Sequence, residues 1–307
     1  MHRPSVPISG IASFAVAAAI GLVVVACSPE EPAASSTPEA TPEPTPEPTL
    51  NAELLDRPWN VLFVGIDHNE AREGRGEPMN TDALMLASLS ADQSRLTLVS
   101  LPRDTVDVPL DDGTTYARKI NGLYAEQGID ALVGGMETLY GVEIDGHVVL
   151  NMDDFAALVE AVDGVRVRLT EPLVDPIVDL DLEPGRYTLD GGEALGYVRT
   201  RVDQDYGRMG RQQEVIVELV ERLTDPDAEV DLAELLDGLD SLETDLPLDQ
   251  LPTLLELGHR ASDAEIERLV IRPPLITFEG DRGDGRGYVL VPDVEAIRGE
   301  VQGLIGE

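Results

Sequence analysis

Short apolar runs separated by polar segments mark the folded part of the chain. Trp59–Ile66, Ala83–Leu89 and Leu96–Leu101 are rich in β-branched and other large apolar residues. Runs of this length and composition are typical of buried strands. The second and third runs are joined by the polar turn Ser90–Arg95 and therefore predict a β-hairpin, while Asp67–Pro78 predicts a loop.

Further along the chain, strand and helix patterns alternate. His147–Met152 and Val165–Leu169 predict strands, and Phe155–Val162 between them predicts a helix. Apolar positions also predict helices through Leu132, Met136 and Leu139, over Val230–Leu239, Leu248–His259 and Val294–Ile305, and a strand over Ile266–Ile271. This interleaving indicates an α/β sandwich. The last third carries no catalytic signature, and we expect it to complete the core.

One stretch, Leu195–Gln213, has an unusual density of arginine. Before it, Asp190 and Glu193 have the spacing of a capping box and predict the start of a helix. A second helix is predicted to begin near Gly207. Four arginines surround the N-terminus of this second helix, where unpaired amides and the helix dipole favour anions. They are Arg199, Arg201, Arg208 and Arg211.

The charge of the whole chain makes this cluster more informative. The sequence has 22 Lys+Arg against 59 Asp+Glu, a formal net charge of −37. Such a protein has no general attraction for anions, and nucleic acid is not an expected partner. Guanidinium groups suit phosphate oxygens. The alternative is that the arginines pair with nearby carboxylates. Arg208 in particular could pair with Asp205, which would leave Arg199, Arg201 and Arg211 to bind phosphate.

Several other chemistries are not indicated. The chain has one cysteine, Cys27, so it can form neither an intramolecular disulfide nor a cysteine metal cage. Its four histidines are scattered, which argues against histidine zinc sites and histidine-based triads. No G-x-S-x-G, P-loop or G-x-G-x-x-G pattern occurs.

Carboxylates lie at the ends of the first three predicted strands. Asp67 follows the first strand, Asp82 precedes the second, and Asp104 follows the third. Asp67 and Asp82 could hold Mg²⁺, or Mn²⁺, because hard cations prefer oxygen ligands and substrate phosphates. Alternatively, an aspartate after a strand forms a turn. Lys119, the only lysine, is either part of the same site or a surface charge.

The N-terminal residues predict export. A short basic region precedes the apolar run Ile11–Ala26, so residues 1–26 read as a signal peptide. The sequence Val24–Cys27 looks like a bacterial lipobox, which makes Cys27 the expected lipidation site. An uncleaved membrane anchor is the alternative. Residues 27–56 form a Pro/Glu/Thr-rich linker, in which about twenty residues in an extended form, at about 3.1 Å each, would span roughly 60 Å. Residues 57–307 are then an extracytoplasmic domain.

Seven segments together resemble the LytR–CpsA–Psr family, extracytoplasmic phosphotransferases of bacterial cell-envelope assembly. The resemblance covers about Arg57 to Glu307. Its motifs are Asn60–Asp67 (NVLFVGID), Asn80–Leu86, Leu96–Thr105 (LTLVSLPRDT), Lys119–Tyr124 (KINGLY), Val162–Val167, Leu189–Arg201 (LDGGEALGYVRTR) and Arg208–Gln213 (RMGRQQ). It implies a three-layer α/β/α sandwich with a central mixed β-sheet.

The resemblance also implies a site and its residues. Metal-binding aspartates of the family match Asp67 and Asp82. Diphosphate-binding arginines match Arg103, Arg199, Arg201 and Arg211, and four further positions fall on the motifs, namely Asp104, Lys119, Arg208 and Gln212. Of these, Arg103, Asp104, Arg199 and Arg201 are expected to act in catalysis and Lys119, Arg208 and Gln212 to bind diphosphate. Asp104 is a candidate base.

Two departures from the family pattern stand out. An arginine that often follows the first aspartate is replaced by His68-Asn69-Glu70, with Arg72 and Arg75 as candidate substitutes. Most members are anchored by a transmembrane helix, whereas this chain carries the lipobox-like Cys27.

The expected activity is transfer of a glycopolymer phosphate from an undecaprenyl or decaprenyl diphosphate-linked glycan to peptidoglycan, with Mg²⁺ as cofactor. The protein would act on the extracytoplasmic face of the cell membrane, held there by the lipid on Cys27. One alternative is a pyrophosphatase that uses water as acceptor at the same pocket. Another is a non-catalytic lipoprotein that binds polyprenyl phosphate.

Overall fold

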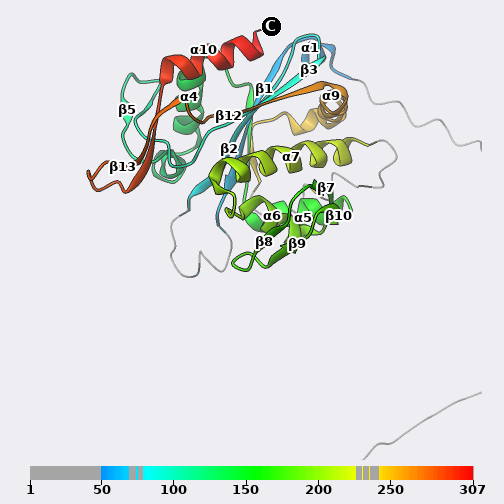
Figure 1. The fold of residues 1–307 in the computed structure, drawn as a ribbon. Coiled ribbons are helices and arrows are strands. Elements are labelled where there is room, and N and C mark those ends of the chain that lie inside the picture. The colour runs from blue at the N-terminus through cyan, green and yellow to red at the C-terminus, as the bar shows by residue number, and fades with distance from the viewer. Residues whose placement is uncertain are drawn as a thin grey trace, which may run out of the picture. The chain divides into compact units, whose positions relative to one another are not determined.

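A six-stranded sheet forms the centre of the folded part, in the order β11–β6–β1–β2–β3–β12 (Figure 1). The strands are β1 (Trp59–Ile66), β2 (Thr81–Leu89), β3 (Arg95–Ser100), β6 (Gly146–Leu150), β11 (Glu243–Thr244) and β12 (Glu265–Val270). β1 pairs with β6, and β3 with β12, in parallel, while the other neighbours are antiparallel. The sheet is therefore mixed, as predicted.

This computed structural model describes residues 50–68, 74, 79–225, 230, 235 and 242–306. Several of the sequence predictions lie outside the described residues. They concern the signal peptide, Cys27, most of the linker, Arg72 and Arg75, and most of the helix Val230–Leu239. Within them, no helix combines the length and apolarity needed to cross a bilayer.

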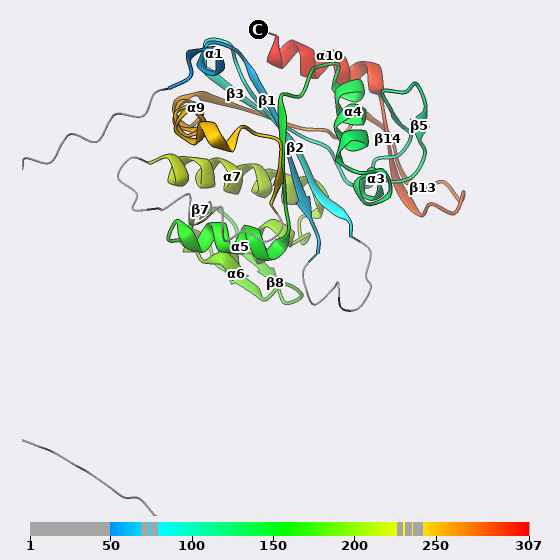
Figure 2. The ribbon, with the colours of Figure 1, turned by 180° about the vertical axis from the view of Figure 1, so that it is seen from behind.

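Helices cover both faces of the sheet (Figures 1 and 2). On one face lie α4 (Ile129–Tyr140) and α10 (Val294–Ile305), with the short α3 (Leu123–Gln127) beside them. On the other face lie α7 (Gln204–Thr224) and α9 (Leu251–Asp263), with α1 (Ala52–Leu55) near α9. Side chains of β1 alternate between the two, since Leu62 and Val64 join one core and Trp59 and Phe63 the other. The three-layer prediction is confirmed.

A further layer packs on the far side of α7. It contains α5 (Met152–Ala161), α6 (Gly191–Arg199) and the strand pairs β7 (Val165–Leu169) with β10 (Gly185–Leu189) and β8 (Leu173–Asp175) with β9 (Leu180–Leu182). These elements share one apolar core with α7. Asp190 and Glu193 form the predicted capping box of α6. Helix α7 begins at Gln204, three residues before the predicted start.

Smaller elements complete the domain. They are the pair β4 (Val108–Pro109) with β5 (Thr115–Tyr116), the pair β13 (Ile276–Asp281) with β14 (Tyr288–Pro292), and the 3₁₀ turns Ile120–Gly122 and Leu248–Gln250. The β13–β14 hairpin was not predicted. It attaches to the segment after β3, where Leu290 N donates to Asp104 O and Val106 N donates to Leu290 O.

Candidate active site

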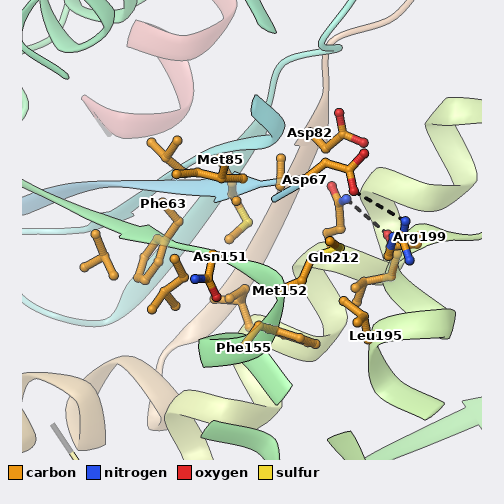
Figure 3. A pocket seen from close by; sticks show the side chains of 18 of the residues that line it. Phe63, Asp67, Asp82, Met85, Asn151, Met152, Phe155, Leu195, Arg199 and Gln212 are labelled. Carbon is orange, nitrogen blue, oxygen red and sulfur yellow. Dashed lines mark hydrogen bonds and ion pairs between the residues drawn. The ribbon is translucent and has the colours of Figure 1, made fainter. Parts of the chain in front are cut away.

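Two aspartates meet at the edge of the sheet where β1 ends and β2 begins. Asp67 follows β1, and its amide donates to Asn80 O at 2.8 Å. In the pairing of the two strands, Gly65 faces Ala83 but Ile66 faces Thr81, so Asp82 is an extra residue in β2. A bulge of this kind re-aims a side chain. Both carboxylates line the same pocket (Figure 3).

Three arginines from different elements surround the Asp82 carboxylate. Arg103, from the turn after β3, is hydrogen-bonded to Oδ1. Arg201, after α6, lies 3.6 Å from Oδ2, and Arg208 of α7 lies 3.7 Å from it. These side chains come from sequence positions up to 126 residues apart. The predicted convergence of strand ends with the Leu195–Gln213 stretch therefore exists in the fold.

Two more carboxylates continue this cluster. Asp205 lies 3.2 Å from Arg201 Nε and 3.4 Å from Arg208 Nε. Asp104 lies 2.7 Å from Lys119 Nζ and 3.9 Å from Arg103 Nε. The cations outnumber these carboxylates, since Arg103, Lys119, Arg201 and Arg208 face Asp82, Asp104 and Asp205. We call these seven residues the charged cluster, and its excess of positive charge suits an anionic ligand.

Arg208 is the most deeply buried member of the charged cluster. Its side chain is 2% exposed, and it makes one hydrogen bond, from Nη1 to Asp82 O at 3.0 Å. Among the described residues, Nε and Nη2 have no hydrogen-bond partner, although Nε lies close to Asp205. Burial lowers the pKa of Arg208, and the neighbouring Arg201 and Arg103 lower it further against the opposing pull of Asp205 and Asp82. A buried guanidinium with unbonded donors is costly, which indicates a place for a bound anion.

Arg211 takes a different position from the one predicted. Its Nε donates to Tyr197 O at 2.9 Å, its Nη2 donates to Thr200 O at 2.6 Å, and both terminal nitrogens bond the Asp203 carboxylate. The predicted role of Arg211 as a diphosphate ligand does not fit this geometry, because its donors are already used to hold the turn between α6 and α7. Diphosphate binding by Arg211 stays a prediction, and the geometry favours Arg208 over Arg211 for that role.

Arg199 and Gln212 lie at the pocket rather than in the charged cluster. Arg199 Nη2 is 3.4 Å from Asp67 Oδ1, and Gln212 Nε2 donates to Val198 O at 3.2 Å. Both side chains line the pocket, and Figure 3 shows Arg199 beside Asp67 and Asp82.

The pocket itself is a cavity of about 110 Å³ between the sheet and helices α5, α6 and α7. Its charged groups gather at one end, and Phe63 and Met85 lie toward the other (Figure 3). The remaining lining is mainly aliphatic and aromatic, including Phe155, Leu195 and Ile216. Such a cavity suits a ligand with a long apolar part and an anionic head.

Asp67 and Asp82 are the residues here that could hold a divalent cation. Among the described residues no three or more His, Cys, Asp or Glu side chains group into a metal site. Mg²⁺, however, is commonly held by one or two carboxylates together with substrate phosphates and water. Two carboxylates at the charged end of the pocket fit that donor set. Asp82 would have to share its oxygens between the cation and the surrounding arginines.

Fold and site together define an α/β protein that presents cations at the mouth of an apolar pocket. The LytR_cpsA_psr family model matches residues 25–293, so the chain belongs to the LytR–CpsA–Psr family. The resemblance and the predicted fold class are thereby confirmed.

Individual relatives agree with this family. The polyisoprenyl-teichoic acid–peptidoglycan teichoic acid transferase TagU of Enterococcus faecalis is 30% identical over 78% of this chain and 77% of its own length. Biofilm regulatory protein A of Streptococcus mutans is 27% identical over 82% of this chain, which spans 64% of that relative. The crystal structure of TagV from B. subtilis superposes with a TM-score of 0.65 at 25% identity, covering 82% of this chain and 98% of that one.

Proposed function

We propose that the protein transfers a glycopolymer phosphate from a polyprenyl diphosphate-linked precursor to peptidoglycan and forms a phosphodiester. The observation that carries this proposal is the buried Arg208, with two unbonded nitrogens, at the junction of the charged cluster and an apolar pocket. The family, and the name of the TagU relative, support the same activity. In this proposal the polyprenyl chain enters the pocket and the diphosphate binds at its charged end.

The transfer step needs charge stabilisation more than covalent help from the protein. A sugar hydroxyl of the acceptor attacks the sugar-side phosphorus, a new O–P bond forms, and the bridging P–O bond breaks. Polyprenyl phosphate leaves with the electron pair, and the hydroxyl proton passes to a base. Arg103, Arg201 and Arg208 would neutralise the charge that develops on the leaving phosphate, with Arg199 at the mouth of the pocket.

A divalent cation is part of this proposal. Mg²⁺, or Mn²⁺, would be held by Asp67 and Asp82 and, when bound, would supply positive charge to the diphosphate oxygens. The chain's own contribution is to place the two carboxylates side by side through the bulge at Asp82.

Asp104 and Lys119 belong to the charged cluster but are not among the residues that line the pocket. Their ion pair of 2.7 Å keeps Asp104 next to a cation. We assign Lys119 to the diphosphate oxygens and Asp104 to proton acceptance from the acceptor hydroxyl, or to orienting Lys119 and Arg103. Asp104→Asn separates these roles, because loss of a base lowers kcat and leaves the KM for the donor unchanged, whereas a misplaced Lys119 raises the KM for the donor.

We further propose that the domain is tethered to the extracytoplasmic face of the membrane by a lipid on Cys27, with the residues between Cys27 and the folded segment that contains α1 as spacer. The sequence pattern alone supports this. Mass spectrometry of the purified full chain would detect a diacylglycerol on Cys27. In Cys27→Ala the protein should be retained by an uncleaved apolar segment or released, and an unmodified cysteine in the wild type would contradict the proposal.

The direct test is an assay of the purified chain with polyprenyl diphosphate-linked glycan and peptidoglycan. We expect glycan covalently joined to peptidoglycan, and a loss of transfer in Arg103→Ala and Arg201→Ala. Arg166→Ala is the matched control, since the Arg166 side chain is 54% exposed and pairs with Glu218 and Glu221, away from the charged cluster. Free glycan phosphate as the sole product would instead make the protein a pyrophosphatase, and tight lipid retention without turnover would make it a binding protein.

A further inference from the structure

The β13–β14 hairpin brings exposed aromatic side chains next to the charged cluster. It lies beside β5 in both views (Figures 1 and 2). Phe278 is 36% exposed and Tyr288 50% exposed. The hairpin is held in place at its far end by Arg286, which bonds Asp107 and Ala117 O. Large exposed aromatic groups on an anchored hairpin are candidates for ligand contact.

Glu279 connects this hairpin to helix α7. Tyr206 Oη donates to Glu279 Oε2 at 3.2 Å, and Tyr288 Oη donates to Glu279 Oε1. Tyr206 directly follows Asp205, which contacts Arg201 and Arg208 in the charged cluster. The exposed Glu279 carboxylate has lone pairs beyond those that the two tyrosines use, so it can accept further hydrogen bonds.

Electrostatics agree with this proximity. Burial and the Glu279 carboxylate raise the pKa of Tyr288 to about 12, and Asp205 and Asp104 add to the shift. The Tyr288 hydroxyl is therefore held as a donor to Glu279. The Tyr288 hydroxyl lies within electrostatic reach of Asp205 and Asp104, which are both members of the charged cluster.

The order of contacts separates the hairpin from the apolar pocket. Asp82 and Arg208 line the pocket, Asp205 contacts Arg208, and Tyr206 and Glu279 follow beyond Asp205. Phosphoryl transfer places the attacking and leaving oxygens roughly in line. If polyprenyl phosphate departs toward the pocket, the attacking hydroxyl must approach from the other side of the charged cluster, which is the side of the hairpin.

We propose that Tyr206, Glu279 and Tyr288 form a subsite for the acceptor sugar of peptidoglycan. Glu279 accepts hydrogen bonds from ring hydroxyls, and the Tyr288 ring packs on the apolar face of the sugar. This inference rests on the proposed transferase function, because it assigns the acceptor to one side of the same site. The proposed ligand of the subsite is the uncharged sugar ring of the acceptor. A sugar ring of the donor glycan is the alternative ligand.

Two variants test the subsite by kinetics. Glu279→Gln keeps the shape of the side chain and removes its charge, and Tyr288→Ala removes the ring. We expect each to raise the KM for the peptidoglycan acceptor about tenfold, with the KM for the donor unchanged. Tyr187→Phe is the matched control, because Tyr187 is a tyrosine of β10 whose Oη donates to Glu183 O and loses only that bond.

The outcomes separate the two proposals. An acceptor KM equal to wild type in both variants would overturn the subsite, and a rise in the donor KM alone would assign it to the donor glycan and overturn the acceptor reading. Ligand-observed NMR can measure binding of a peptidoglycan disaccharide to the full chain, and this measurement does not depend on turnover. If the wild type binds the disaccharide, the variants do not, and no transfer occurs, the subsite stands and the proposed function fails. If the wild type transfers glycan but the variants bind the disaccharide as it does, the subsite alone fails.

Discussion

Two arginines three residues apart on α7 have opposite environments. Both are buried, with Arg208 at 2% and Arg211 at 8% exposure. Arg211 lies in the turn between α6 and α7, where it bonds two backbone carbonyls and both oxygens of Asp203. Arg208 lies in the charged cluster, where Asp82 O is its single hydrogen-bond acceptor within the part of the chain that the structure describes.

We interpret this difference as that between a structural arginine, Arg211, and a candidate ligand-binding arginine, Arg208. A buried guanidinium is tolerated when its donors are satisfied, and the Arg211 region meets this condition within the chain. The Arg208 region does not, and two other arginines close by add repulsion. The chain therefore keeps an unfavourable charge arrangement at Arg208, which a bound diphosphate would relieve.

The largest effect is expected at Arg208. Arg208→Met keeps an unbranched chain in the buried position and removes the charge. Loss of one such preorganised donor should lower kcat/KM for transfer about 100- to 1,000-fold. Thermal stability should stay the same or rise, because an incompletely bonded buried charge is removed. Steady-state kinetics and calorimetry on the same sample measure both. Near-normal transfer would show that Arg208 is structural, and Arg166→Met controls for the loss of an arginine elsewhere.

Asp82 divides its oxygens between the arginines and the proposed cation, and Asp82→Asn distinguishes the two uses. Removal of its charge should make the charged cluster more positive, so inorganic pyrophosphate should bind several-fold more tightly without metal. Transfer should nevertheless fall by about tenfold or more and respond less to added Mg²⁺, because a metal ligand is lost. Isothermal calorimetry with and without EDTA measures the binding. Unchanged Mg²⁺ dependence in this variant would remove Asp82 from the metal site.

Arg211 should affect stability first and activity second. Arg211→Met leaves Tyr197 O and Thr200 O without their donor and Asp203 without its cation. Since Asp203 is partly exposed, we expect a loss of about 2 kcal/mol in the free energy of unfolding. Urea unfolding measures it, and Arg166→Met should stay within about 0.5 kcal/mol of wild type. A variant with normal stability and no affinity for the lipid diphosphate would return Arg211 to the diphosphate site.

Local sequence patterns predicted much of the fold. β1, β7 and α10 have the predicted boundaries, because clean alternation and a sustained helical period specify them. The capping box of α6 was equally readable from Asp190 and Glu193. The β13–β14 hairpin was missed because its strands are short and partly exposed, and its glycine-rich loop reads only as a turn.

The sequence predicted the site less completely than the fold. Motifs identified Arg103, Arg201 and Asp82, which do converge. The motifs could not show which of Arg208 and Arg211 is the better candidate for phosphate binding, because both are arginines on one helix. The position of the α6–α7 turn decides which of the two donates its N–H groups to the chain itself. The bulge at Asp82 could not be predicted from the sequence either, since it arises from the register between two strands. Glu279 lies in the third of the chain that was assigned to scaffold, and only tertiary contacts bring it to α7.

The smallest expected effect lies in the structural region and concerns pH. Asp175 accepts hydrogen bonds from Thr200 Oγ1 at 2.7 Å and Ile177 N at 3.0 Å, and these bonds lower its pKa below 3.8. A carboxyl with a lowered folded pKa adds stability that is present above the unfolded pKa and is lost as pH falls through the folded value. Asp175→Asn keeps an acceptor for Thr200 but does not titrate. Urea unfolding between about pH 7 and about pH 3 should therefore show the advantage of the wild type over this variant shrinking on acidification. A constant difference in the free energy of unfolding between wild type and variant across that range would mean that the Asp175 charge does not help Arg211 to hold Thr200 in place. Arg211 alone would then account for the structural role of the α6–α7 turn region.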